Sequence, residues 1–320
     1  MSPKAQREVW AETLVEVAGE NPEILVLDAD LASSTQAAKF EAAHPDRFLQ
    51  MGIAEQNMVG VAAGLAFEGF VPWLSSFGIF FSTRAVDQVR MSVAQTHANV
   101  KIAAGYTGIK AGYGGKTHVD IADIATIRAM PGMTLLAPAD NAELRSMIRW
   151  ASECQGPVYL RVDREAAADV FDETYVFEPG RVVLLREGVQ VLLVSTGQQT
   201  ARTLEAAQLL GDMGLWAGVL HVPTIKPADE AAIAAICANY PFIVTTEEHN
   251  VRGGLGSLVA EIVTAAEPRP VIRIGVQDTW IESAPHAYLL EKHGLTPERI
   301  ARRVREIWYP NEQSTETRES

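Results

Sequence analysis

Glu55 is the residue of this sequence whose surroundings most strongly suggest proton chemistry. It lies in the run Met51–Ala66, where apolar and small residues dominate. A helix so poor in polar groups is predicted to be buried, and a buried carboxylate must be paired or protonated. Either state makes Glu55 a candidate for proton transfer. Taken alone, the same residue is also explained as a glutamate that opens a helix, where the helix dipole favours a carboxylate.

Further candidates come directly after predicted strands. Asp28 and Asp30 follow the first apolar run, and the aromatic segment Ser75–Phe81 follows a later one. A glycine-rich loop, Gly112–His118, and the polar segment Tyr159–Arg164 come later in the chain. Ligands of open α/β sheets lie outside the carboxyl ends of the strands, so these residues are well placed for a binding site. For Asp30, capping of the next helical turn is the structural alternative.

Two glycine-rich stretches fail as nucleotide-binding motifs. Gly115-Lys116-Thr117 resembles the end of a P-loop, but Lys110 stands where that motif needs a glycine. Gly253–Gly256 lacks the final glycine of a dinucleotide-binding loop, because Val259 stands there. The histidines show no zinc-ligand spacing, so we predict no metal ligands in this chain.

The elements that must position these residues alternate regularly in the first half of the chain. The predicted strands are Ile24–Leu27, Val71–Leu74, Val100–Ala104, Thr134–Ala137 and Val158–Val162. The predicted helices are Ala5–Ala18, Glu55–Phe67, Arg84–Thr96, Ile121–Ala129 and Ala142–Ser152. Apolar strands separated by helices indicate an α/β fold, with a mostly parallel sheet flanked by helices.

The alternation stops after Phe171 and then restarts. Strands are predicted at Val189–Ser195, Ala217–His221, Phe242–Thr246 and Val271–Ile274, and helices at Ala201–Met213, Glu230–Ala238, Leu255–Ala265 and Pro285–His293. We therefore predict two α/β domains, at residues 1–172 and 188–309, joined by a linker at 173–187. The polar end, 310–320, is predicted to be a flexible tail.

Composition and charge exclude several classes of function. The formal net charge of −13 argues against binding to nucleic acid, whose phosphates would be repelled. The two cysteines, Cys154 and Cys237, lie far apart in the sequence, which is typical of a reducing compartment. No apolar run has the length of a membrane span, and the first residues show no signal peptide. A cytoplasmic protein without membrane contact is the expectation.

Taken together, the order and spacing of these motifs resemble the C-terminal half of a transketolase. The resemblance runs from Arg7 to about Arg302 and includes Thr245–Asn250 and Gly253–Gly256. It implies a pyrimidine-binding domain followed by the transketolase C-terminal domain. The pyrophosphate-binding half of that family, with its Gly-Asp-Gly motif, has no counterpart here. The chain thus resembles one subunit of a split transketolase, which would need an N-terminal subunit and form a dimer of heterodimers.

The resemblance implies thiamine diphosphate as cofactor, with Mg²⁺ or Ca²⁺ bound by the partner subunit. In this family the glutamate that matches Glu55 hydrogen-bonds the aminopyrimidine ring and favours the tautomer that activates the cofactor. Phe77 and Phe80 match aromatic positions against which that ring stacks, and Asp30 matches an aspartate near the cofactor. The alternative for Phe77 and Phe80 is an ordinary place in the core.

The resemblance also assigns residues to the substrate. His118 matches a histidine near the reacting carbons, and Arg7, Ser34 and Arg164 match positions that hold the phosphate of a sugar phosphate. Each arginine alone would more often be a surface residue.

Two positions depart from the family pattern. Tyr106 stands where a phosphate-binding histidine is common, and Gly114 where an aspartate contacts the acceptor. The loss of that acid removes a discriminating hydrogen bond, so the acceptor is expected to differ from the usual pentose phosphate unless Tyr113 or Lys116 compensates. Lys116 is a candidate for binding an anionic group, phosphate or sulfonate.

The predicted activity is transfer of a two-carbon ketol unit from a ketose donor to an aldose acceptor. Three alternatives remain open at this stage. A β-subunit of a 2-oxoacid dehydrogenase would share the architecture and the glutamate, and the chain could also be a fragment of a deoxyxylulose-phosphate synthase. A non-catalytic paralogue would keep the fold without the cofactor. The sugars, the partner chain and the pathway are not specified by the sequence.

Overall fold

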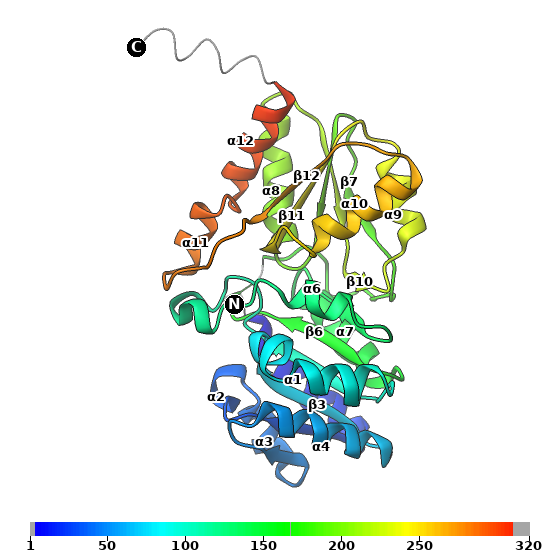
Figure 1. The fold of residues 1–320 in the computed structure, drawn as a ribbon, viewed down its shortest axis with the longest axis vertical. Helices are drawn as coiled ribbons and strands as arrows, with labels where there is room; N and C mark the ends of the chain where they lie inside the picture. Colours follow the sequence, from blue (N-terminus) through cyan, green and yellow to red (C-terminus); the bar gives the residue numbers. More distant parts are fainter. Residues whose placement is uncertain (1–3, 167, 310–320) are drawn as a thin grey trace.

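Two β-sheets, each covered by helices on both faces, lie at opposite ends of the elongated molecule (Figure 1). The computed structural model describes residues 4–166 and 168–309. One sheet has seven strands in the order β10-β5-β6-β4-β3-β1-β2, and the other has five in the order β12-β11-β8-β9-β7. All neighbouring strands are parallel except the pairs β10–β5 and β7–β9. The predicted α/β class with two mostly parallel sheets is confirmed.

The first sheet has seven strands, and all of them except β2 and β10 agree with apolar runs predicted from the sequence. They are β1 (Ile24–Asp28), β2 (Phe48–Gln50), β3 (Val71–Phe77), β4 (Lys101–Gly105), β5 (Thr134–Leu136), β6 (Val158–Val162) and β10 (Thr224–Lys226). Strands β1, β3, β4 and β6 are buried along their whole length, which explains why they read as continuous apolar runs rather than as alternating patterns. Strands β2 and β10 are three residues each and carry no such signal.

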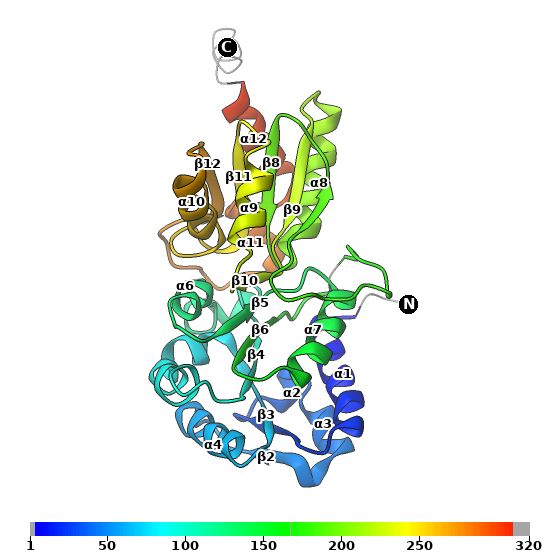
Figure 2. The ribbon, with the colours of Figure 1, turned by 90° about the vertical axis from the view of Figure 1, so that its right-hand side faces the viewer.

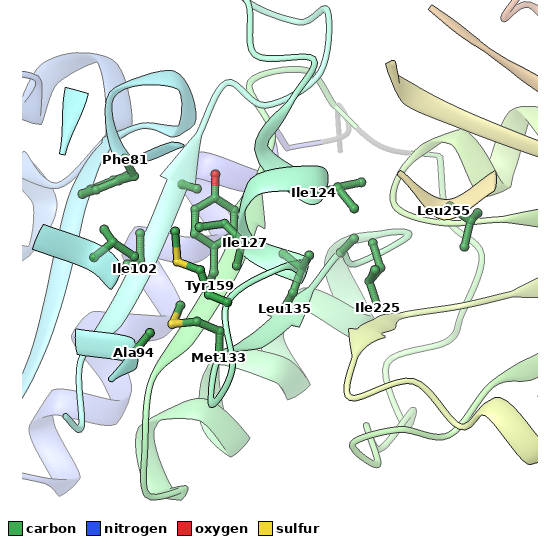
Figure 3. Packing of buried hydrophobic residues seen from close by; sticks show 14 of the residues in the cluster. Phe81, Ala94, Ile102, Ile124, Ile127, Met133, Leu135, Tyr159, Ile225 and Leu255 are labelled. Carbon is green, nitrogen blue, oxygen red and sulfur yellow. The ribbon is translucent and has the colours of Figure 1, made fainter. Parts of the chain in front are cut away.

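Helices cover both faces of this sheet, as Figure 2 shows. On one face lie α1 (Gln6–Glu20), α2 (Ala32–Thr35), α3 (Ala38–Ala43) and α7 (Asn141–Glu153). On the other lie α4 (Glu55–Phe67), the segment η2 (Phe80–Arg84), α5 (Val86–Gln88) and η3 (Val89–Ala94), and α6 (Asp123–Arg128). The short helices η1 (Pro45–Arg47) and η4 (Gly112–Thr117) belong to loops. Figure 3 shows the apolar packing between β4, β6 and the second group.

Helix α4 is only half buried, which corrects the prediction of a wholly buried helix. Glu55, Met58 and Ala62 face the core, whereas Gly60 and Gly64 are exposed on the opposite side. The exposed side carries Gln56 and Asn57 in the first turn and Gly60, Gly64 and Phe67 after it, so most of its length is small or apolar surface that suits contact with another protein chain.

The second sheet is formed by β7 (Val183–Arg186), β8 (Val191–Ser195), β9 (Ala217–His221), β11 (Ile243–Asn250) and β12 (Val271–Val276). Its helices are α8 (Gln199–Asp212), α9 (Glu230–Cys237), α10 (Leu255–Ala266), α11 (His286–Lys292) and α12 (Pro297–Trp308). Three elements of this half were not predicted from the sequence: helix α12 and the strands β7 and β10. Strand β7 lies inside the predicted linker 173–187, and β10 leaves the second half of the chain to pair with β5 of the first sheet. The predicted tail, 310–320, lies outside the described residues.

Buried ionic groups connect the two domains. Arg161 of β6 forms a buried ion pair with Asp123 of α6, with Nε 2.9 Å from Oδ2, and its Nη2 donates to the carbonyl of Glu248 at 3.2 Å. Lys110 forms a buried ion pair with Asp163 and lies 3.5 Å from Glu248. A hydrogen-bonded guanidinium satisfies three acceptors at once in this geometry, so the packing of the two domains depends on specific side chains.

The carboxylate of Glu247 predicts a pH-dependent contribution to stability. It is fully buried and accepts N–H groups of Leu255 and Gly256 at 2.7 and 2.9 Å, and burial raises its pKa to about 7 from 4.5. A raised pKa in the folded state stabilises the fold fully below pH 4.5, and this stabilisation is lost as the pH rises through 7. This group therefore makes the free energy of unfolding decrease between pH 4.5 and 7. We expect Glu247→Gln to remove this part of the decrease, and urea unfolding across the same pH range measures it.

Wild type and variant must be compared directly, because His249 acts in the opposite sense. Burial lowers the pKa of His249 to about 4 from 6.5, so its contribution increases with pH through that window. An unfolding free energy that depends on pH identically in both proteins would contradict the role of Glu247.

Candidate functional site

The candidate site lies at the carboxyl ends of β1, β3 and β4, where open parallel sheets bind ligands. Phe77 ends β3, Gly105 ends β4 with Tyr106 next to it, and Glu55 begins α4. Strands β3 and β4 are neighbours paired in register, with Phe77 opposite Gly105, so their ends meet. The fold thus brings residues that are about 50 positions apart in the sequence to one edge of the sheet.

Glu55 is buried, with 1% of its surface exposed, and it is paired with Arg84. Nη1 of Arg84 donates to both carboxylate oxygens, at 3.0 Å to Oε1 and 2.9 Å to Oε2. The sequence predicted that this carboxylate would need a partner but did not identify Arg84. The sequence does not show the backbone conformation of η2, which carries Arg84. In that segment the N–H of Ala85 donates to the carbonyl of Phe80 in a π turn. Such turns occur frequently at functional sites.

Four rings form an aromatic cluster beside this ion pair. The ring of Phe77 lies nearly parallel to Phe80, with 5.9 Å between centroids, and 4.2 Å from Tyr106. His118 meets Phe77 and Phe80 edge-on, at 5.9 and 5.7 Å. Edge-to-face and offset contacts are the favourable geometries for aromatic rings. Arg84 joins this cluster to Glu55, because its guanidinium carbon lies 4.2 Å from the centroid of Phe80.

A positively charged group of side chains, which we call the arginine wall, lies on the other side of Tyr106. Nη1 of Arg7 donates to the Tyr106 hydroxyl and to the carbonyl of Ser34, both at 2.7 Å. The guanidinium carbons of Arg7 and Arg164 lie 5.8 and 5.6 Å from the centroid of Tyr106. Among the described residues, Nε of Arg7 is buried without a hydrogen-bond partner. Two guanidinium groups around one phenol, with a donor still unsatisfied, are suited to an anionic group.

The contribution of Ser34 differs from the one predicted. Its backbone carbonyl, not its hydroxyl, holds Arg7 and accepts a bond from Tyr106 at 3.2 Å. Tyr106 has a φ of 60°, a left-handed conformation that is uncommon for a residue with a side chain. Strained residues of this kind cluster at functional sites.

Two predicted site residues are not drawn into these clusters. Asp30 and Lys116 are exposed, and neither has a side-chain hydrogen bond or ion pair within the parts of the chain that the structure describes. Asp30 has a φ of 62°, and its N–H donates to Gln50 at 2.9 Å. The buried aspartate of this loop is Asp28, whose pKa is raised by burial and whose Oδ1 has no described partner.

The loop that carries His118 explains the glycine at position 114. A Cβ atom added to Gly114 would lie 2.7 Å from the Cβ of His118, closer than such atoms approach one another. The present loop conformation therefore excludes an aspartate unless His118 moves. Lys116 follows at the exposed side of the same loop, two residues before His118.

Across the residues with described structure, no group of three or more histidine, cysteine, aspartate or glutamate side chains is arranged to hold a metal ion. No helix in that part of the chain combines the length and the apolar character needed to cross a membrane.

Comparisons with known proteins assign the family. Residues 2–169 match the family described as transketolase, pyrimidine binding domain, and residues 180–300 match transketolase, C-terminal domain. A 6-deoxy-6-sulfo-D-fructose transketolase subunit of Clostridium sp. (strain MSTE9) is 40% identical, over 94% of this chain and 94% of its own. An apulose-4-phosphate transketolase subunit of Phocaeicola vulgatus is 32% identical, over 95% of this chain and 97% of its own.

A solved structure agrees with these relatives. It is described as a split gene transketolase in an inactive β4 tetramer. It is 42% identical, with a TM-score of 0.86, and the match covers 95% of this chain and 98% of that one. Both domains and nearly the whole chain are accounted for by one family. The chain therefore belongs to the transketolase family, as the C-terminal section of a split transketolase.

Proposed function

We propose that this chain is the C-terminal subunit of a thiamine-diphosphate-dependent transketolase and transfers a two-carbon ketol unit from a ketose donor to an aldose acceptor. The observation that carries the proposal is the juxtaposition of a buried carboxylate, Glu55, with an aromatic wall and an anion-binding wall at one edge of the first sheet. A carboxylate, stacking rings and guanidinium groups are the three kinds of group needed for a charged heterocyclic cofactor and a sugar phosphate.

The residues present fit the pyrimidine end of thiamine diphosphate. Glu55 is a buried acceptor whose one described partner, Arg84, is 46% exposed and reaches it from the open side. Phe80 is partly exposed, beside the buried Phe77, and offers a ring face for stacking. When bound, the cofactor supplies the carbanion chemistry that cleaves and forms the carbon–carbon bond. Glu55 holds the proton that the pyrimidine needs, because a carboxylate in a dry site transfers protons effectively.

The substrate is proposed to lie between His118 and the arginine wall. His118 reaches the same cluster from the glycine-rich loop, and its ring can donate a hydrogen bond to an oxygen that develops charge. Arg7 and Arg164 bind the anionic end, with Tyr106 between them as the spacer. Asp30 lies at the exposed entrance and is proposed to contact the cofactor only in the assembled enzyme.

An N-terminal subunit is proposed to complete the enzyme. It would supply the pyrophosphate site and the Mg²⁺ or Ca²⁺ that the described residues of this chain offer no ligand cluster for. The outer face of α4, which begins at Glu55 and exposes Gly60, Gly64 and Phe67 farther along, suits this contact. The similar split transketolase is described as inactive when it forms a β4 tetramer, which supports a need for both subunits. A dimer of heterodimers is the proposed assembly.

The acceptor is proposed to be an aldose with an anionic group, phosphate or sulfonate. Gly114 stands where the family pattern has an aspartate, whose negative charge would repel such a group. Lys116 adds a cation at the exposed side of the loop. The Clostridium relative is named for a sulfonated sugar, which supports a wider range of anions.

Lys116→Ala tests the anionic acceptor. We expect KM for a phosphorylated or sulfonated aldose to rise about tenfold with kcat little changed, since one charge-assisted hydrogen bond contributes about 1.5 kcal/mol. KM for an uncharged aldose of the same length should stay the same. Equal KM values for the charged acceptor in both proteins would contradict the assignment.

Reconstitution tests the proposed function as a whole. This chain is mixed with candidate N-terminal subunits, thiamine diphosphate and Mg²⁺, and ketol transfer from several ketose phosphates is measured. Activity is expected only when both chains are present. Turnover by this chain alone would contradict the split-subunit proposal, and decarboxylation of pyruvate without ketol transfer would favour a 2-oxoacid dehydrogenase β-subunit.

A further inference from the structure

Arg84 makes the two contacts that the proposed function assigns to the pyrimidine ring of the cofactor. It donates hydrogen bonds to the Glu55 carboxylate at 3.0 and 2.9 Å, and its planar guanidinium lies 4.2 Å from the centroid of Phe80. A stacked aminopyrimidine would also offer a planar face to a phenylalanine and a polar edge to a carboxylate. A carboxylate can accept several hydrogen bonds, so the exclusion comes from Phe80: two planar groups cannot stack on the same face of one ring.

The pair is asymmetric in a way that permits exchange. The Glu55 side chain is 1% exposed and fixed at the start of α4, whereas the Arg84 side chain is 46% exposed. Burying an unpaired carboxylate is costly, so the free chain needs a cation beside Glu55. A half-exposed arginine can leave toward solvent at little cost, because much of its side chain already faces solvent.

No other described charge takes over this contact. The charged groups on the elements packed against α4 are Asp28 on β1, Arg84 on η2, Asp87 on α5 and Arg90 on η3. Asp87 and Arg90 pair with one another at 2.9 Å. Asp28 accepts bonds from Leu31 and Gln50 instead. Glu55 is therefore compensated by Arg84 within the described part of the chain.

We propose that Arg84 is a built-in place-holder for the pyrimidine ring. In the free subunit it neutralises Glu55 and covers Phe80, and the cofactor displaces it when the second subunit closes the site. This inference rests on the proposed function, because it assumes that the pyrimidine binds at Glu55 and Phe80. It gives Arg84 a regulatory role: Glu55 stays charge-balanced and Phe80 stays covered until both the partner and the cofactor are present.

The first test measures cofactor affinity in the assembled two-subunit enzyme, with Mg²⁺ present. Removal of a competing side chain should tighten binding of thiamine diphosphate in Arg84→Met by about three- to tenfold, since a place-holder that occupies the site for roughly 70–90% of the time weakens the affinity by that factor. Calorimetric titration gives the dissociation constant without reference to turnover. Arg84→Lys keeps the positive charge but loses the planar guanidinium group. Its affinity for thiamine diphosphate should lie between those of the wild type and Arg84→Met.

Arg90→Met is the matched control. It removes an arginine from the adjoining segment, where the partner is the exposed Asp87 instead of Glu55, and the affinity for thiamine diphosphate should equal that of the wild type. Unchanged or weaker binding in Arg84→Met, with normal binding in the wild type, would overturn the place-holder. Absence of binding in the wild-type complex would overturn the proposed function itself.

The second test needs neither cofactor nor partner. In the free chain, Arg84→Met leaves Glu55 unpaired and should lower Tm, by about 1–2 °C for each kcal/mol of stability lost in a chain of 320 residues. The double variant Glu55→Gln/Arg84→Met should recover most of this loss, because no buried charge remains. If the Tm changes of the single variants Glu55→Gln and Arg84→Met simply add in the double variant, the pairing of Arg84 with Glu55 in the free subunit is refuted.

Discussion

Glu55→Gln is expected to lower kcat of the reconstituted transketolase by about 100- to 10,000-fold, the range lost when a positioned acid or base is removed. Glutamine keeps the size of the side chain and can accept one hydrogen bond from Arg84, so the fold should be retained. It cannot hold or transfer the proton that the proposed mechanism assigns to Glu55. Steady-state ketol transfer at saturating thiamine diphosphate measures the loss, and circular dichroism of the free subunit checks the fold.

Glu68→Gln provides the control for this substitution. Glu68 lies at the other end of α4 and is exposed, so the same chemical change should leave kcat within about twofold. A Glu55→Gln enzyme with near-normal turnover would refute the proton-transfer role, whereas an unfolded variant would show that the carboxylate serves the fold. A loss of kcat in the folded variant supports the assignment.

Arg161→Met is expected to destabilise the subunit by about 3–5 kcal/mol, the largest effect on stability that the structure predicts. Arg161 is 6% exposed and bonds Asp123 through Nε at 2.9 Å and through Nη2 at 3.3 Å. Methionine fills a similar volume but leaves the fully buried Asp123 without its cation. Urea unfolding at neutral pH measures the change in the free energy of unfolding.

The matched control is an exposed ion pair with a similar distance. Arg149 lies 2.9 Å from Glu16, but their side chains are 47% and 61% exposed. Arg149→Met should cost less than about 1 kcal/mol, because solvent screens a surface pair. Equal destabilisation by the two variants would contradict the argument that burial of Asp123 sets the penalty. Loss of cooperativity in Arg161→Met alone would indicate that the two domains separate, since the Nη2 of Arg161 also bonds the carbonyl of Glu248.

The sequence was sufficient for most of the fold because buried parallel strands are continuous apolar runs. Strands β6 and β9 agree with their predicted bounds at both ends, and α4 does so as well. The short strand β10 was missed because pairing with β5, not its own composition, makes it a strand. Strand β7 was missed for a related reason, since it is an antiparallel edge strand in a segment with acids and Pro179-Gly180.

For the site, the sequence by itself determined which residue types were available: Glu55, Phe77, Phe80, His118 and the arginines, in the order of a transketolase C-terminal section. It could not determine their partners, because a contact between residues 29 positions apart depends on the packing of two helical segments on one sheet. Only the tertiary structure decided that Arg84 neutralises Glu55, that Tyr106 lies between two arginines, and that Gly114 has no room for a side chain. Burial is the physical reason. A carboxylate withdrawn from water must be neutralised, and the packing of the fold decides which cation lies close enough to do so.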